Sequence, residues 1–181
     1  MLSSDKSAII VGCLEKNGKH VGIVLEARKL TIYDADDPSM PLWMVFNAGG
    51  TNDTQAMLQR DNNDVTCVTA LNGTIVVGGL NQNNHSGGVR QINFPKDNSF
   101  AHYTTSIYNG YFKGNIQQRN SLLGVTPQDS GQIVETNVND VAVTVLPNAP
   151  IDADTGLPVP TIAVATDGGV SVIKDDGSVV D

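Results

Sequence analysis

The fold is decided by a pattern that first runs through residues 63–69 (Asn-Asp-Val-Thr-Cys-Val-Thr), 74–78 (Thr-Ile-Val-Val-Gly) and 87–92 (Gly-Gly-Val-Arg-Gln-Ile). The same order of segments returns as Asn-Asp-Val-Ala-Val-Thr-Val at 139–145, Thr-Ile-Ala-Val-Ala at 161–165 and Gly-Gly-Val-Ser-Val-Ile at 168–173. Short apolar segments that recur in a fixed order are typical of repeat proteins, in which each unit buries its apolar face against a neighbour. The repeat therefore predicts a stack of similar units.

The repeated segments have the character of β-strands. They are short, rich in Val, Ile and Thr, and bounded by Gly, Asn, Asp or Pro. No segment has a convincing helical period. Hairpin turns are expected at Asn72-Gly73, Asp167-Gly168 and Asp176-Gly177, because two-residue turns favour residues that accept positive φ. We expect strands at 9–14, 21–25, 30–33, 42–46, 65–71, 74–78, 89–94, 101–108, 138–146, 161–166, 169–173 and from 179 onward.

These strands group into an all-β domain of about three four-stranded antiparallel units. The units span about 7–46, 64–108 and 140–181, with connectors at 47–63 and 109–137. In each repeat the second strand is an almost continuous apolar run, as expected for a strand that is buried on both faces, whereas the third strand alternates. This gradient is typical of β-propeller blades. The third unit stops where its outermost strand would begin, so we expect a fragment of a longer propeller.

Charge and hydropathy narrow the possible partners. The 181 residues carry a net charge of −8, and 17% are charged, against about 25% in an average domain. Nucleic-acid binding needs clustered Lys and Arg, and no such cluster occurs. No secretory leader and no membrane-spanning run is apparent. We expect no nucleic-acid partner, no membrane insertion, and a soluble protein located in a virion or outside the cell.

Two longer stretches resemble propeller-like repeats in structural proteins of marine tailed phages. The first is the run 138–150 followed by 161–173, and the second is Leu-Thr-Ile-Tyr-Asp at 30–34 with Pro-Leu-Trp-Met-Val-Phe at 41–46. The resemblance implies a tail or tail-fibre component of the virion that presents blade loops to a host surface. It brings no catalytic residues, so the implied role is structural or adhesive and non-enzymatic.

Two acidic loops are candidate cation sites. Asp34, Asp36 and Asp37 precede Pro38, and Asp152 and Asp154 flank Ala153. Closely spaced carboxylates can share one calcium ion, but both loops lack the further ligands of a complete calcium-binding loop. We expect Asx-type turns there and no cofactor; calcium at Asp152 and Asp154 is the alternative.

One segment concentrates the aromatic residues. Aromatic faces beside hydroxyl and amide groups are a common way to bind sugar rings. The competing interpretation is an outer strand whose rings cover the edge of a blade. If the segment does bind a host-surface glycan, the candidate contacts are His102, Tyr103, Tyr108, Tyr111 and Phe112, with Phe100 at its start.

The remaining hypotheses concern catalysis and assembly. A sugar-binding or carbohydrate-active propeller is the alternative to the adhesive module, and catalysis would need two carboxylates near each other. Asp64 and Asp140, which the repeat places at matched positions, are the candidates, although backbone hydrogen bonding is a simpler role for them. Cys13 and Cys67 are expected to be small buried side chains. The third unit has no following sheet to bury Val164, Val172 and Ile173. We therefore expect that a second copy of the chain covers them, by self-association.

Overall fold

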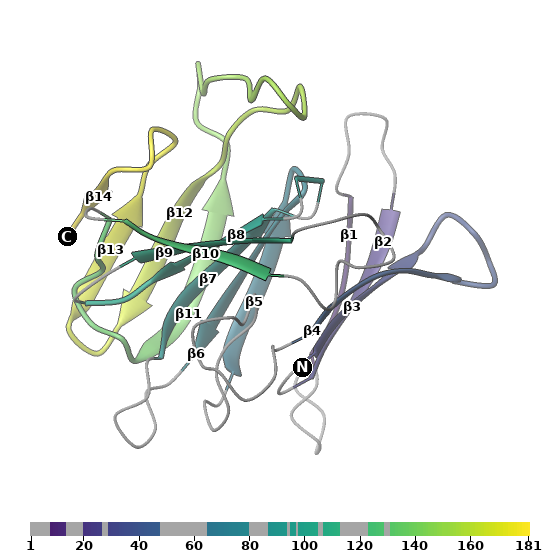
Figure 1. Cartoon of the computed structure of the whole chain (residues 1–181), viewed down its shortest axis with the longest axis horizontal. Coiled ribbons are helices and arrows are strands. Elements are labelled where there is room, and N and C mark those ends of the chain that lie inside the picture. The colour runs from purple at the N-terminus through teal and green to yellow at the C-terminus, as the bar shows by residue number, and fades with distance from the viewer. Residues whose placement is uncertain are drawn as a thin grey trace.

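The computed structural model describes residues 8–13, 20–26, 29–47, 65–79, 87–93, 95–96, 98–104, 107–112, 123–128 and 131–181. Within these ranges the regular structure consists of strands, and no helix occurs. The strands form three antiparallel sheets, which confirms the all-β prediction and the division into three units (Figure 1).

The first sheet contains β1 (Ala8–Cys13), β2 (His20–Glu26), β3 (Lys29–Asp34) and β4 (Leu42–Asn47). Each strand pairs with the next along the chain, so the sheet is a simple meander. Ile23, Leu30 and Ile32 are fully buried in it, whereas Leu42 and Trp43 at the start of β4 are exposed. The strand ranges agree with the prediction to within one residue at nearly every end.

The second sheet has six strands, and the prediction of four is wrong. In chain order they are β5 (Val65–Leu71), β6 (Thr74–Gly79), β7 (Gly88–Asn93), β8 (Asn98–His102), β9 (Ile107–Phe112) and β10 (Leu123–Gln128), again a meander. The predicted strand 101–108 divides into β8 and β9, and β10 lies in the predicted connector 109–137. Pro127 argued against a strand, but β10 is at the edge of the sheet, where a missing N–H is tolerated.

The third sheet contains β11 (Val138–Thr144), β12 (Thr161–Thr166), β13 (Gly169–Ile173) and β14 (Val179–Val180). The order is sequential, and the short β14 pairs with β13 as the expected outermost strand.

Tight turns lie where the dipeptides predict them. Asn72 and Gly73 connect β5 to β6 with φ values of 51° and 74°, the left-handed pair of a type I′ turn. Gly177, with φ of 82°, lies between β13 and β14, where the Lys174 amide donates to the Ser178 carbonyl. These turns fix the pairing register of their strands.

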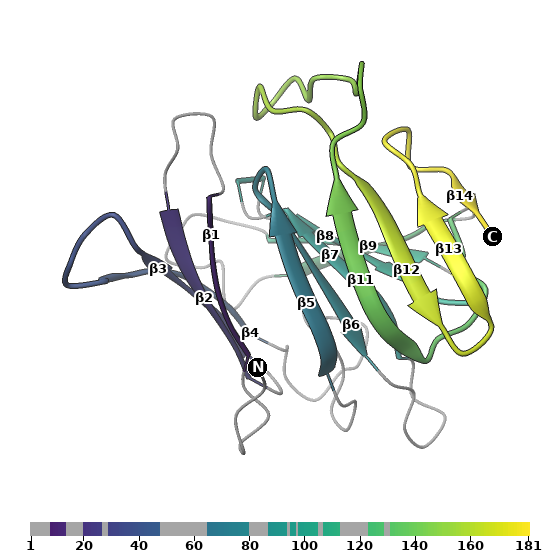
Figure 2. The same ribbon diagram turned by 180° about the vertical axis from the view of Figure 1, so that it is seen from behind.

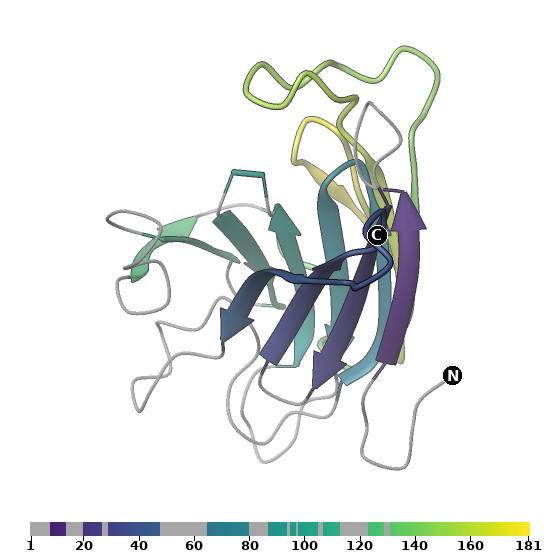
Figure 3. The same ribbon diagram turned by 90° about the vertical axis from the view of Figure 1, so that its right-hand side faces the viewer.

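The first strands of the three sheets are neighbours. β5 contacts β1 on one side and β11 on the other, and β11 also contacts β6. Figure 2 shows β5 and β11 side by side, and Figure 3 shows the first sheet layered in front of the second. The hydroxyl of Thr66 donates to the carbonyl of Val138 at 2.7 Å, a direct bond between β5 and β11. The sheets therefore approach each other most closely along their first strands.

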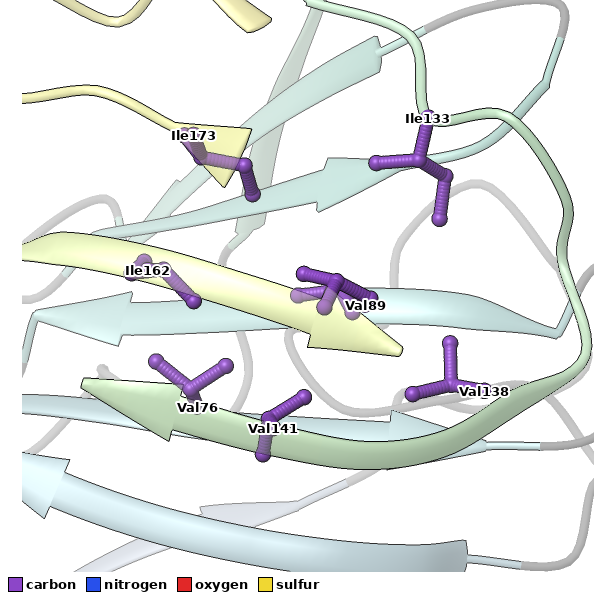
Figure 4. Packing of buried hydrophobic residues seen from close by; sticks show 8 residues of the cluster. Val76, Val89, Ile133, Val138, Val141, Ile162 and Ile173 are labelled. Atoms are coloured by element: carbon purple, nitrogen blue, oxygen red, sulfur yellow. The ribbon is translucent and has the colours of Figure 1, made fainter. Parts of the chain in front are cut away.

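A shared core fills the space between the second and third sheets (Figure 4). Val76 and Val89 come from the second sheet, and Val141, Ile162 and Val164 are among the third-sheet residues that meet them. Burial of these side chains is worth about 1.5–3 kcal/mol each. Cys67 packs against the same cluster as a free cysteine, and burial raises the pKa of its thiol. The side chain of Cys13 lies outside the described part of the chain.

The prediction for the second strands of the repeats is confirmed. β6 and β12 are internal strands of separate sheets, and their Val and Ile side chains at 75–77, 162 and 164 are buried. The expectation that Val164 and Ile173 need cover from outside the chain is wrong, because the second sheet and Ile133 cover both. The missed element is the segment 131–137, which was expected to be only part of a connector and lies between the two sheets.

Candidate functional site

A cavity of about 460 Å³ opens between the second sheet and the loops of the third. Its volume lies in the range of small-molecule binding sites. One wall is formed by side chains of β6, β7 and β8, and the opposite wall by residues 157–160 and the β13–β14 turn. The site thus lies between two repeats, and a single repeat could not form it.

The second-sheet wall follows from the two-residue period of a strand. Asn98, Phe100 and His102 alternate along β8 and all line the cavity, as do Gln91 and Asn93 of β7. In the sheet, Gln91 pairs with Phe100, and Asn93 pairs with Asn98. The result is one aromatic ring surrounded by amide and imidazole groups. The predicted alternation of side chains along the strand 89–94 is therefore present, and its polar residues Gln91 and Asn93 border the cavity.

The opposite wall is an apolar run, Leu-Pro-Val-Pro at 157–160, that reaches the site through an ordered loop. The amide of Asp152 donates to the carbonyl of Leu157 at 2.9 Å, and the Asn72 side chain donates to the carbonyl of Pro158 at 3.1 Å. These bonds attach the loop to itself and to the β5–β6 turn. Two prolines restrict the backbone further, so this wall is preorganised.

An ion pair joins the two walls at the rim. The Lys96 ammonium contacts the Asp152 carboxylate directly and lies 3.2 Å from Asp154. Burial opposes the charged form of Lys96, but the hydrogen bonds and charges of the two aspartates outweigh it and raise its pKa. Burial likewise opposes ionisation of Asp152, and the contact with Lys96 outweighs it and lowers the pKa of that carboxyl.

His102 is almost fully enclosed in the cavity lining, with 3% of its surface exposed. Its Nδ1 lies 2.8 Å from the Gly131 carbonyl oxygen, which can only accept a hydrogen bond. Nδ1 therefore carries the proton, and Nε2 of the neutral ring is an acceptor. Burial lowers the pKa of His102, and the charge of Arg90 lowers it further against the effect of Gly131. Nε2 itself has no hydrogen-bond partner.

The sequence-predicted glycan contacts divide into three groups. His102 lines the cavity, together with Phe100. Tyr103 lies outside the cavity, since it is buried where Arg90 donates to its hydroxyl at 2.5 Å. Tyr108, Tyr111 and Phe112 lie on β9, and their side chains are outside the described part of the structure.

The predicted Asx-type turns are present in both acidic loops. Oδ1 of Asp34 accepts the Asp36 amide, and Oδ1 of Asp152 accepts the amides of Asp154 and Thr155 at 3.0 and 2.9 Å. Among the described residues, no three His, Cys, Asp or Glu side chains are grouped closely enough to hold a metal ion. Calcium binding at Asp152 and Asp154 would have to compete with Lys96.

The proposed matching of Asp64 with Asp140 is wrong in register. Cys67 pairs with Gly78 and Asp140 pairs with Ala165, and Gly78 and Ala165 are equivalent in the repeat. Cys67 is therefore the structural counterpart of Asp140. Asp64 lies outside the described residues, and Asp140 accepts the amide of Val141, as the simpler interpretation predicted. The shared Asn-Asp-Val letters align the two strands three residues away from their structural match, although the bulges of both strand pairs fall at equivalent positions.

Comparison with known proteins gives no assignment: no protein-family model, curated protein or solved structure matches the chain. Within the described ranges, no helix has the length and apolarity needed to cross a membrane. The physical features of the cavity and loops are therefore the basis for any functional proposal.

Proposed function

We propose that the three sheets are β-propeller-type blades and that the chain is a non-enzymatic structural or adhesive module. The meander order within each sheet, the contacts between first strands and the buried face between sheets support this assignment. Two additional strands make the second blade wider than a four-stranded one. From the resemblance to marine phage repeats we further propose that the module belongs to a virion, in or near the tail fibre.

The observation that carries the adhesive role is the exposure of apolar side chains on projecting loops. Leu42 and Trp43 follow the β3–β4 loop and expose 60% and 38% of their surface, and Ile151 in the loop 145–160 exposes 61%. Both loops extend beyond the sheets (Figure 1). Exposed apolar side chains on a rigid scaffold mark contact surfaces.

Binding to cells tests this role. Fluorescently labelled protein is incubated with a panel of marine bacteria, and bound fluorescence is measured by flow cytometry. We expect saturable binding to at least one strain and its loss in the double variant Leu42→Ser and Trp43→Ser. Ser178→Asp, on an exposed turn of the third sheet, is the control. Absence of binding to every strain, or equal binding by the double variant, would contradict the proposal.

A sugar-binding propeller is the second candidate, favoured by the Phe100 ring among polar side chains in the cavity. A carbohydrate-active version needs a proton donor and a base or nucleophile. In the described part of the cavity Asp152 is already paired with Lys96, which makes it unsuitable as a proton donor. Binding without catalysis is therefore the form of this hypothesis that we develop.

Self-association through the outer face of the third sheet is part of the proposal. Ala142, Ala163, Val172 and Val180 form one row across all four strands by their pairing. Val180 is 48% exposed, and the row carries no charge. A face of this kind matches the packing between blades. We propose that a second copy of the chain covers it.

A further inference from the structure

We infer that the cavity between the second and third sheets binds a neutral, polyhydroxylated ligand of the saccharide class. Hydroxyl groups of the ligand donate to His102 Nε2 and Asn98 Oδ1, and one face of its ring packs on Phe100. The inference rests on the second proposed function and assigns its site and ligand chemistry.

The first argument is the hydrogen-bonding state of His102. With Nδ1 committed as a donor to Gly131, the ring presents only a lone pair at Nε2. That atom is buried without a partner inside the cavity lining. Buried acceptors without partners are rare in folded proteins because their desolvation is uncompensated. A ligand that satisfies Nε2 must supply a donor such as a hydroxyl group.

Asn98 makes the same demand four residues away, at the other end of β8. Its Oδ1 is buried and has no partner, and it lines the same cavity. Asn98 and His102 flank Phe100 on one face of the strand, so the two acceptors lie on either side of an aromatic ring. A sugar has hydroxyl donors around its edge and an apolar C–H face, which suits this order of acceptor, ring and acceptor.

The opposite wall fits the other face of such a ligand. Leu157, Pro158 and Pro160 are apolar and held in place by the loop bonds described above. A flat molecule between Phe100 and this wall would be enclosed on both faces. Gln91 also lies in the lining and can accept or donate at its edge, and Asn93, whose Oδ1 accepts the Lys96 amide at 3.1 Å, can donate there.

The charges favour a neutral ligand over an ion. The lining carries Asp152, Asp175 and Asp176 against Lys96 and Lys174, and the chain has a net charge of −8, so the site has no excess of positive charge to attract an anion. An amine would be drawn to carboxylates, but the two unpartnered atoms belong to an amide and a neutral imidazole. The groups that need partners are thus neutral acceptors, the complement of a hydroxyl group.

Nuclear magnetic resonance of the full chain tests the inference directly. Glucose, galactose, mannose and N-acetylglucosamine are titrated separately while the ring nitrogens of His102 are followed in a long-range ¹H–¹⁵N spectrum. We expect at least one sugar to bind saturably, with a shift of His102 Nε2 and with Nδ1 remaining protonated. Phe100→Ala should weaken binding about tenfold or more by removing the stacking surface.

Matched variants separate binding from folding. His102→Leu removes the acceptor, whereas His102→Gln retains one and should recover part of the affinity. Asn98→Ala should weaken binding, and Asn139→Ala, at an exposed asparagine of β11, should not. Melting temperatures of the variants show whether each remains folded.

Three results would overturn the inference: no saturable shift with any of the four sugars, binding of ethylenediamine or acetate at Nε2 in place of sugars, or full sugar affinity in Phe100→Ala. Ordered water would then be the partner of Nε2. Cell binding by the wild type without binding of any of the four sugars would leave the adhesive module intact and remove only the sugar site. Saturable sugar binding without binding to any bacterial strain would remove only the adhesive role.

Discussion

The hydroxyl of Thr66 donates a 2.7 Å hydrogen bond to the carbonyl oxygen of Val138. Thr66 is the residue that the β5–β6 pairing skips, and Val138 lies directly before the residue that the β11–β12 pairing skips. The irregular positions of two consecutive repeats are therefore bonded to each other. Bulges free a backbone group from its own ladder, and here the freed position joins two sheets.

Replacing Thr66 with Val keeps the shape of the side chain and removes this bond. We expect a loss of about 1 kcal/mol in the free energy of unfolding, with Val138 left short of a partner. For a chain of this length that corresponds to a fall of about 2–4 °C in melting temperature. Thr144→Val, at an exposed position of β11, is the control and should change little. Equal melting temperatures for Thr66→Val and the wild type would show that the bond adds no stability.

Gly78 of β6 lies close to Val138 of the third sheet. A Cβ atom at this residue would lie 2.5 Å from Cys67 Sγ and 2.5 Å from Val138 Cγ1. Gly78→Ala should therefore destabilise the protein by about 1–3 kcal/mol through overpacking, measured by urea unfolding. Gly156→Asn is the control, because that residue has open space and a left-handed φ that Asn accepts. A neutral or stabilising Gly78→Ala would mean that the sheets separate at no cost.

The Lys96–Asp152 pair should make stability depend on pH in the acid range. The pKa of Asp152 is lowered from 3.8, so its contribution is present above that pH and is lost as pH falls through the folded-state value. The pKa of Lys96 is raised from 10.5, so its contribution is lost only as pH rises above that value. Lys96→Met should cost about 0.5–1 kcal/mol at neutral pH because the pair is partly exposed.

That cost should vanish once Asp152 is protonated. Unfolding in urea, compared for the wild type and Lys96→Met at neutral pH and well below the ordinary Asp pKa, provides the measurement. A cost that is the same at both pH values would assign the effect to packing of the Lys96 stem and not to charge.

His102 should produce a second pH dependence, which begins closer to neutral pH. Its pKa is lowered from 6.5, so below that pH the unfolded chain binds a proton that the folded protein does not. Stability should then fall as pH decreases from 6.5, by at most about 1.4 kcal/mol per pH unit. His102→Gln should remove this slope. An unchanged slope in the variant would show that other groups cause it.

Val172 lies in the middle of the apolar row on the outer face of the third sheet. In light scattering at micromolar concentration we expect a dimer or larger assembly for the wild type. Val172→Asp should dissociate it, because an unpaired charge in an apolar contact costs several kcal/mol. Ser178→Asp adds the same charge on an exposed turn and should leave the assembly unchanged. A monomeric wild type would refute self-association.

The strands that were predictable from sequence share strong local signals. The run from Thr74 to Gly79 is apolar and bounded by a type I′ turn, and the pairing it predicts is present. β10 was missed because Pro127 and Gly124 are unfavourable within a strand and only its edge position makes them acceptable. The local sequence does not reveal which strand will be at an edge.

The candidate site was predictable only in part. The aromatic segment drew attention to His102 and Phe100, and both line the cavity. The opposite wall at 157–160 comes from another repeat, and the Lys96–Asp152 pair joins residues far apart in the chain. Long-range pairings of this kind leave no periodic trace in a single sequence. The strand register that matches Asp140 with Cys67 and not with Asp64 is equally a product of tertiary packing.

The connection from the second sheet to the third is itself a structural element. The Gly88 amide donates to the carbonyl of Thr136, and the Ile133 amide to that of Tyr103, while the amide of Val134 donates to the Ser171 hydroxyl of β13. The same few residues thus hold both sheets at once. Local opening of either sheet must break bonds that the other also needs, so the two repeats unfold as one cooperative unit despite their separate hydrogen-bonded ladders.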